Sequence, residues 1–376
     1  GSCHALIVTG CMAQRYQKEI IEEVPEVDAV LGTTSYGDIV KALEEAVAGN
    51  HFEEFRDIDY LPDTGSKRVL TTGGHFGYLK IAEGCDKHCT YCIIPKLRGK
   101  FRSVPMERLI AQAEDMAEQG VKELILVAQE TTVYGKDLYG KKSLHILLKK
   151  LCEIRGIRWI RILYCYPEEI YDELIETIRD EKKICHYLDI PIQHASDRIL
   201  KRMGRRTSKQ ELIDIVGKLR KEIPDIVLRT TLITGFPGET EEDHEELKEF
   251  VDEMEFERLG VFTYSPEEDT PAATMPDQID EEVKEDRQAD IMELQQEIVF
   301  DQAEDMIGKE VLVMIEGKVA DESAYIGRTY GDAPKVDGYI FVQTGELLMT
   351  GDFAKVRVTG ALEYDLIGVL SDEYTE

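Results

Sequence analysis

The sequence lacks several features that would point to particular classes of protein. It contains no run of about 18 apolar residues, the length that a membrane-spanning helix needs, so we expect no membrane association. Basic residues are scarce, with 45 Lys and Arg against 75 Asp and Glu and a net charge of −30. Phosphate binding requires concentrated positive charge, so this balance argues against a nucleic-acid substrate. The lack of a signal-peptide pattern favours a cytoplasmic protein, and the lack of an initial Met suggests part of a longer one.

The eight cysteines are few enough, and spaced in such a way, that a disulfide framework is not expected. Three of them, Cys85, Cys89 and Cys92, form a C-x3-C-x2-C run. Thiolates at that spacing can bind three irons of a 4Fe–4S cube and leave the fourth iron open to a small molecule. A structural zinc site would normally add a second C-x2-C pair, and none follows here. Free or zinc-bound cysteines remain the alternative.

Residues 77–264 repeat one pattern, in which a β-branched run is followed by an amphipathic helix. Six strands with five helical crossovers predict a parallel sheet that curls into a partial (β/α)6 barrel, within an α/β chain of two or three domains. Active sites of such barrels lie where the strands end. The cysteine run follows the first predicted strand. The strands are predicted at 78–82, 123–128, 159–164, 187–190, 227–233 and 259–264.

Polar or glycine-rich segments at or near other strand ends provide candidate cofactor contacts. Gln129 ends the second strand and Gln193 the fourth, while Arg229 and Gly235 belong to the fifth strand and its turn. Glycine permits a tight turn and a close backbone approach to a ligand. Ordinary strand-to-helix turns are the alternative reading of each segment.

The cysteine run, with Tyr91 before its last cysteine, resembles that of the radical S-adenosylmethionine (radical SAM) superfamily. Three further motifs, residues 235–240 (GFPGET), 191–196 (PIQHAS) and 10–14 (GCMAQ), resemble the methylthiotransferase branch of that superfamily. The resemblance implies a truncated α/β N-terminal domain at 1–50 and a linker at 51–70. It also implies a radical SAM core at 71–305 and a small all-β TRAM barrel at 306–372.

The resemblance also implies the roles of individual residues. Cys85, Cys89 and Cys92 would hold the radical SAM cluster, and Tyr91 would lie near the adenine of S-adenosylmethionine. Cys11 would bind a second 4Fe–4S cluster that is incomplete in this chain, because the family's two other N-terminal cysteines are missing. Cys3 matches neither of those motifs, and small buried side chains are expected at the remaining positions, Cys152, Cys165 and Cys185. Gln129, Gln193, Arg229 and Gly235 would contact S-adenosylmethionine.

Charge separates two branches of that family. Residues 309–370 contain six Lys and Arg against ten Asp and Glu, a poor surface for RNA. This favours the RimO type, which methylthiolates an aspartate β-carbon in the basic twelfth protein of the small ribosomal subunit, over the MiaB type, which modifies a tRNA adenosine. Residues 327–338 and 264–270 also resemble RimO. The expected partners are that ribosomal protein and an electron donor protein; a non-catalytic metal- or ribosome-binding protein is the third hypothesis. Four cations after the cysteine run would bind a carboxylate or lie in solvent: Lys96, Arg98, Lys100 and Arg102.

Overall fold

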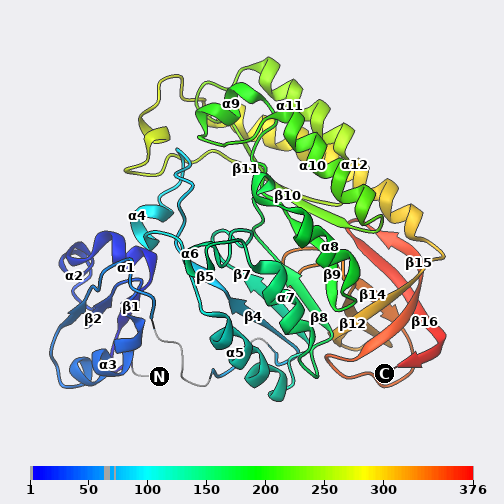
Figure 1. The fold of residues 1–376 in the computed structure, drawn as a ribbon, viewed down its shortest axis with the longest axis horizontal. Coiled ribbons are helices and arrows are strands. Elements are labelled where there is room, and N and C mark those ends of the chain that lie inside the picture. Colours follow the sequence, from blue (N-terminus) through cyan, green and yellow to red (C-terminus); the bar gives the residue numbers. More distant parts are fainter. Residues whose placement is uncertain (1–2, 63–67, 72, 376) are drawn as a thin grey trace.

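A computed structural model describes residues 3–62, 68–71 and 73–375. The chain forms a small N-terminal α/β unit, a six-stranded sheet with its helices, and a closed β-barrel. Figure 1 shows the N-terminal unit (blue) and the β-barrel (orange to red) on opposite sides of the central sheet. Residues 1–2 and 72 of the predicted domains, and 63–67 of the predicted linker, lie outside the described residues. No helix in the described part is long and apolar enough to cross a membrane.

The N-terminal unit is a three-stranded parallel sheet with helices beside it. Its third strand falls within the segment predicted as a linker, so the linker begins later than predicted. This short strand was not predicted, because Phe52 is the single apolar residue among its three residues and the strand therefore shows no alternation of apolar and polar side chains. The elements are β1 (Ile7–Thr9), α1 (Cys11–Tyr16), α2 (Lys18–Glu23), β2 (Ala29–Leu31), η1 (Tyr36–Asp38), α3 (Ile39–Val47) and β3 (Phe52–Glu54).

The central sheet has six parallel strands, which lie side by side in the order in which they occur along the chain. Each connection passes through a helix, so the predicted partial (β/α)6 barrel is confirmed. The strands are β4 (Phe76–Lys80), β7 (Glu123–Val127), β8 (Trp159–Ile162), β9 (Ile184–Asp189), β10 (Val227–Thr234) and β11 (Arg258–Thr263). The longer crossover helices are α5 (Met106–Glu118), α7 (Leu144–Cys152), α8 (Asp172–Asp180), α10 (Lys209–Glu222) and α11 (Glu241–Met254). Shorter elements are β5 (Ala82–Glu83), α4 (Ile94–Arg98), β6 (Arg102–Ser103), α6 (Lys136–Tyr139), η2 (Pro167–Glu169), α9 (Asp197–Arg202) and η3 (Pro271–Thr274).

Side chains along the strands alternate between two environments, as the period of two in a β-strand requires. Leu124 and Leu126 belong to the main core that the strands share with the helices. Ile125, between them, belongs instead to a second cluster that includes Met314 and Phe353 of the C-terminal barrel. The C-terminal barrel therefore packs against the inner face of the curved sheet.

A 26-residue helix, α12 (Glu281–Met306), leads from the sheet to the C-terminal barrel. The barrel is closed by five strands in the order β12-β13-β14-β16-β15, as the predicted small all-β domain requires. It has its own apolar core, which includes Val313, Val342 and Val356. Its strands are β12 (Glu310–Lys318), β13 (Ala324–Arg328), β14 (Ile340–Gln343), β15 (Phe353–Leu362) and β16 (Asp365–Thr375).

A buried ion network joins the two parts. Glu123, at the start of β7, binds Arg161 of β8 at 2.8 Å and Arg328 of β13 at 2.6 Å, and all three side chains are fully buried. Arg328 also binds Glu316 at 2.6 Å. Burial alone would raise the pKa of Glu123, but the two guanidinium groups hold that pKa below its ordinary value.

Candidate metal centre

The cysteine run forms a loop between β5 and α4, just beyond the C-terminal end of β4. Cys85 and Cys89 are buried, and Cys92 is half-buried. The loop begins at Gly84, where φ is +76° and a Cβ atom would lie 2.1 Å from the carbonyl oxygen of Lys100. Only glycine fits there, because the backbone of the following segment passes directly over this position.

Cys85 and Cys92 line a cavity of about 390 Å³ together with Gln129, which follows β7. The side-chain oxygen of Gln129 is buried and has no hydrogen-bond partner. A buried amide oxygen without a partner costs free energy, so it marks a position that a ligand donor can satisfy. The other lining residues are Lys80, Ile94, Val127, Ala128, Tyr164 and Tyr166.

Cys89 is not among the residues that line this cavity, but its sulfur is 3.8 Å from the hydroxyl of Tyr166, which is. The ring of Tyr166 is also in contact with two cations: the guanidinium carbon of Arg205 lies 4.4 Å from its centroid, and the Lys87 ammonium lies 5.0 Å from it. Sequence analysis missed Tyr166 and Arg205. The only available signal was that Tyr166 follows the third strand, where a barrel places its site.

The segment after α9 holds the loop in place. The backbone N–H of Thr90 donates to the carbonyl of Met203 at 2.9 Å, and the Thr90 hydroxyl donates to the carbonyl of Arg202 at 2.8 Å. Gly204, where this segment passes the loop, has φ +74°, a left-handed conformation that favours glycine. The cysteines are therefore presented on a fixed support.

The surroundings of the cysteine loop oppose free thiolates at Cys85 and Cys92. Burial raises the pKa of Cys85 to about 11, and the negative charges of Cys89 and Cys92 add to that effect. Three thiolates cannot gather here without positive charge, which irons would supply in exchange for the thiol protons. In the described part of the chain, no three His, Cys, Asp or Glu side chains are placed to hold a single metal ion. A 4Fe–4S cube takes one thiolate per iron, so its ligands need not meet at one point. The donor set fits such a cube.

Lys87, inside the cysteine loop, lies in a group of carboxylates. Its ammonium is 2.6 Å from Glu169, 3.4 Å from Glu168 and 3.8 Å from Glu130. Burial raises the pKa of Glu130 to about 7, although its hydrogen bond with Thr132 opposes the shift. This ion cluster attaches the loop to the ends of β7 and β8.

The remaining predicted cofactor residues lie in different places. The Tyr91 ring packs edge-on against Phe236 at 6.4 Å, and the Gln193 side-chain oxygen is buried without a partner. At Gly235 a Cβ atom would lie 2.2 Å from the Lys284 side chain, so packing alone already requires glycine there. None of these three residues is among the described residues that line the cavity of about 390 Å³.

Arg229 lies nearer to the C-terminal barrel than its prediction implied. It binds Asp189 at 2.9 Å and Asp337 of the β13–β14 connection at 3.4 Å. It lines a second cavity, of about 400 Å³, between the sheet and the β-barrel. The residue comes early in β10, and the start of a barrel strand is the end away from the usual site.

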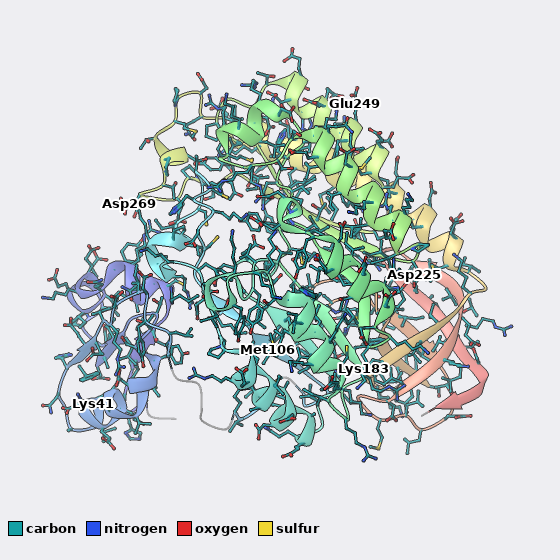
Figure 2. The ribbon with its side chains drawn as sticks, in the orientation of Figure 1. Lys41, Met106, Lys183, Asp225, Glu249 and Asp269 are labelled. Atoms are coloured by element: carbon teal, nitrogen blue, oxygen red, sulfur yellow. The ribbon has the colours of Figure 1, made fainter. Side chains whose placement is uncertain are left out.

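Cys11 begins α1, and its sulfur accepts a hydrogen bond from Arg98 of α4 at 3.3 Å. The other cations after the cysteine run also contact protein groups. Lys96 donates to the carbonyl of Asp269 at 2.7 Å, and Asp269 lies above α4 in Figure 2. Lys100 donates its backbone N–H to Asp59, and Arg102 lies 3.6 Å from the same carboxylate. Arg98 therefore connects this segment to the N-terminal unit, while the other three cations contact the segment after β11 and the residues between β3 and β4.

Comparisons with known proteins agree with this architecture. The Radical SAM superfamily pattern matches residues 79–251, and the TRAM domain pattern matches residues 307–370. A protein of Lachnoclostridium phytofermentans named "Ribosomal protein uS12 methylthiotransferase RimO" is 66% identical over 368 residues, which are 98% of this chain and 84% of the relative. The chain belongs to the RimO family of radical SAM methylthiotransferases.

A second named relative supports the assignment. The RimO protein of Clostridium perfringens is 51% identical over 374 residues, or 99% of this chain and 83% of that protein. Among solved structures, coproporphyrinogen III oxidase (HemN) from Escherichia coli, described as a radical SAM enzyme, is 16% identical with a TM-score of 0.48 over 75% of this chain and 66% of that one. Radical SAM methylthiotransferases use 4Fe–4S clusters and S-adenosylmethionine, and the cysteine loop of this RimO-family chain has the donor set for one such cluster.

Proposed function

We propose that this protein transfers a methylthio group to the β-carbon of an aspartate in ribosomal protein uS12. The observation that carries the proposal is the 66% identity, over 98% of the chain, with a relative named for this reaction. The cysteine loop, with its buried sulfurs beside a cavity of about 390 Å³, supplies a place for the chemistry.

In this proposal, Cys85, Cys89 and Cys92 hold the radical SAM cluster. When bound, the cluster and S-adenosylmethionine supply a radical able to remove hydrogen from an unactivated carbon, which acid–base groups cannot do. Gln129 offers its unpartnered amide oxygen to the ligand in the cavity, and Gln193, outside the cavity lining, has a second buried amide oxygen for a cofactor contact. Tyr91 packs beside the loop, and Cys11 is one ligand of the second cluster.

The described residues that line the cavity are largely apolar or aromatic, and Tyr164 and Tyr166 bring two rings to it. Lys87 and its carboxylates keep the loop fixed while ligands enter and leave.

The charge of the C-terminal barrel turns out to be a weaker guide to the substrate than its sequence implied. Arg328 is fully buried, but several of the acids are buried or half-buried as well, Glu316 and Asp332 among them. The exposed charges of residues 309–370 are evenly divided between basic and acidic. They are Lys309, Lys318, Lys335, Lys355 and Arg357 against Glu310, Asp321, Glu322, Glu346 and Glu363. The choice of a ribosomal protein over a tRNA adenosine therefore rests on the named relatives.

The proposal carries further expectations about partners and place. A ribosomal substrate places the enzyme in the cytoplasm, without a role for a membrane. Reduction of the cluster requires an electron donor protein. The net charge of −30 attracts a basic ribosomal protein and speeds its encounter with the enzyme.

The test is mass spectrometry of the product. The full-length natural protein, loaded anaerobically with iron and sulfide, is incubated with small ribosomal subunits, S-adenosylmethionine and a reductant. One methylthio group on an aspartate of uS12 is expected, and its absence from the Cys89→Ala variant is the matched control. An unmodified uS12 together with a methylthiolated adenosine in added tRNA would replace this proposal with the MiaB-type reaction.

A further inference from the structure

Arg205 is a buried cation that the fold leaves without a carboxylate partner. Arg205 follows Gly204 in the segment after α9, and the residue is 7% exposed. One terminal nitrogen donates to the carbonyl of Pro191 at 2.8 Å. Its Nε and its other terminal nitrogen are buried without any hydrogen-bond partner. Among the described residues, no carboxylate forms an ion pair with Arg205.

The fully buried arginines of this chain show what is unusual here. Arg161 and Arg328 share the carboxylate of Glu123, at 2.8 Å and 2.6 Å. Burial of a guanidinium without an opposite charge costs free energy, because one hydrogen bond and one ring contact do not replace the solvation that is lost. The two unpartnered donors of Arg205 therefore point to an anion bound nearby when the protein works.

The cysteine loop lies beside the segment that carries Arg205. The guanidinium carbon lies 4.4 Å from the centroid of the Tyr166 ring, and the hydroxyl of that ring is 3.8 Å from the sulfur of Cys89. The backbone bond from Thr90 to Met203 fixes the loop against the segment that carries Arg205. Glu168, the nearby carboxylate, binds Lys87 instead.

We propose that Arg205 is the counter-charge for the Cys89 side of the bound 4Fe–4S cluster and that it raises the reduction potential of that cluster. The inference rests on the proposed function only in requiring a cluster at Cys85, Cys89 and Cys92. Arg205 acts on the cluster through charge and through its free N–H donors, with the Tyr166 ring as its platform. It is a positioning residue, and it takes no part in bond making or breaking.

The physical reason lies in the charge balance of reduction. One electron from an external reductant enters the cluster and no proton accompanies it, so the site gains one negative charge. A buried positive charge nearby stabilises the reduced state more than the oxidised state. Hydrogen bonds to cluster sulfurs act in the same direction, and charge, hydrogen bonding and solvent exposure are the means by which proteins set such potentials.

The experiment is an anaerobic redox titration of the reconstituted chain, followed by electron paramagnetic resonance, without S-adenosylmethionine. Arg205→Gln removes the charge and keeps a polar side chain. Arg205→Lys keeps the charge but loses the planar guanidinium with its several N–H donors. Arg206→Gln is the matched control, because it removes the same charge from the next residue, which is exposed. Iron and sulfide content are measured first in every variant.

Arg205→Gln is expected to lower the equilibrium constant for reduction at least tenfold, which corresponds to about 59 mV for one electron. Arg205→Lys is expected to lower it about threefold, and this arm decides the question if the glutamine variant takes up no iron. Arg206→Gln is expected to leave it unchanged. Potentials that match the unsubstituted chain in both Arg205 variants would overturn the inference, even if affinity for S-adenosylmethionine fell. Failure of the unsubstituted chain to load any cluster would instead overturn the proposed function.

Discussion

Replacing Arg328 by leucine tests whether the buried ion network holds the C-terminal barrel on the central sheet. The guanidinium binds Glu123 and Glu316, each at 2.6 Å, and donates to the carbonyl of Asp332 at 2.8 Å. Breaking a buried ion pair by removing one partner costs about 3–5 kcal/mol, because the remaining charge stays buried. Glu123 keeps Arg161 in the variant, while the Asp332 carbonyl loses its partner, for which about 1–3 kcal/mol is typical. We therefore expect the free energy that holds the β-barrel on the central sheet to fall by about 3–5 kcal/mol.

The only tryptophan of the chain reports on this interface directly. Trp159 is 6% exposed and packs edge-on against Phe353 of β15, with ring centroids 4.9 Å apart. Its fluorescence in urea should therefore follow separation of the β-barrel, whereas far-ultraviolet circular dichroism follows the whole chain. At a slope of about 2–3 kcal/mol per molar urea, the fluorescence midpoint of Arg328→Leu should fall by about 1–2 M. It should also precede the dichroism midpoint, since the two parts then unfold separately.

Arg357→Leu is the matched control, because it removes an exposed arginine from the same β-barrel. Combining Arg328→Leu with Glu123→Gln should cost less than the sum of the two single changes, since the second removes the charge that the first leaves buried. An Arg328→Leu midpoint that moves no further than the control would refute the account of the network given above.

Three further predictions, which use four substitutions, test the cysteine loop. Cys89→Ala should abolish the visible absorbance and the bound iron of the reconstituted chain, whereas Cys165→Ala, in the core behind β8, should retain both; equal iron in the two variants would exclude Cys89 as a ligand. Gly84→Ala should destabilise the chain by about 2–4 kcal/mol and impair cluster loading, because its Cβ would meet the Lys100 carbonyl at positive φ; an unchanged urea midpoint would contradict this. The pKa of Glu130 is raised to about 7, so the native state keeps a proton that the unfolded chain releases, and stability should fall as pH rises from about 4.5 to 7, by up to about 3 kcal/mol. Glu130→Gln should flatten that slope in urea midpoints measured without metal at pH 5 and pH 7, and a slope that survives would assign it to other groups.

The central barrel was predictable because its strands and helices have strong periodicity. The strand predicted at 123–128, for example, differs from β7 by one residue. Local spacing also identified the cysteine run, because ligands of one cluster lie within eight residues. The short strand β3 was missed, since a strand with a single apolar residue leaves no pattern to read.

The candidate site was only partly predictable. Gln129 follows its strand directly and lines the cavity beside Cys85, as a polar residue at a strand end should. Arg229 comes early in β10 and pairs with Asp337 from a segment more than 100 positions away, a contact that strand patterns do not show. Tyr166 and Arg205 were missed because a tyrosine and an arginine acquire their significance only from the groups packed around them.

The sequence by itself determined the order of elements, the parallel sheet and the three cysteines, because periodicity and short-range spacing are local properties of a chain. Tertiary structure decided which charges are buried and which are exposed. It paired Arg328 with Glu123 across two parts of the molecule and left Arg205 beside the cysteine loop without a carboxylate. Those contacts join residues that are distant along the chain, and the energy of a charge depends on what surrounds it in three dimensions.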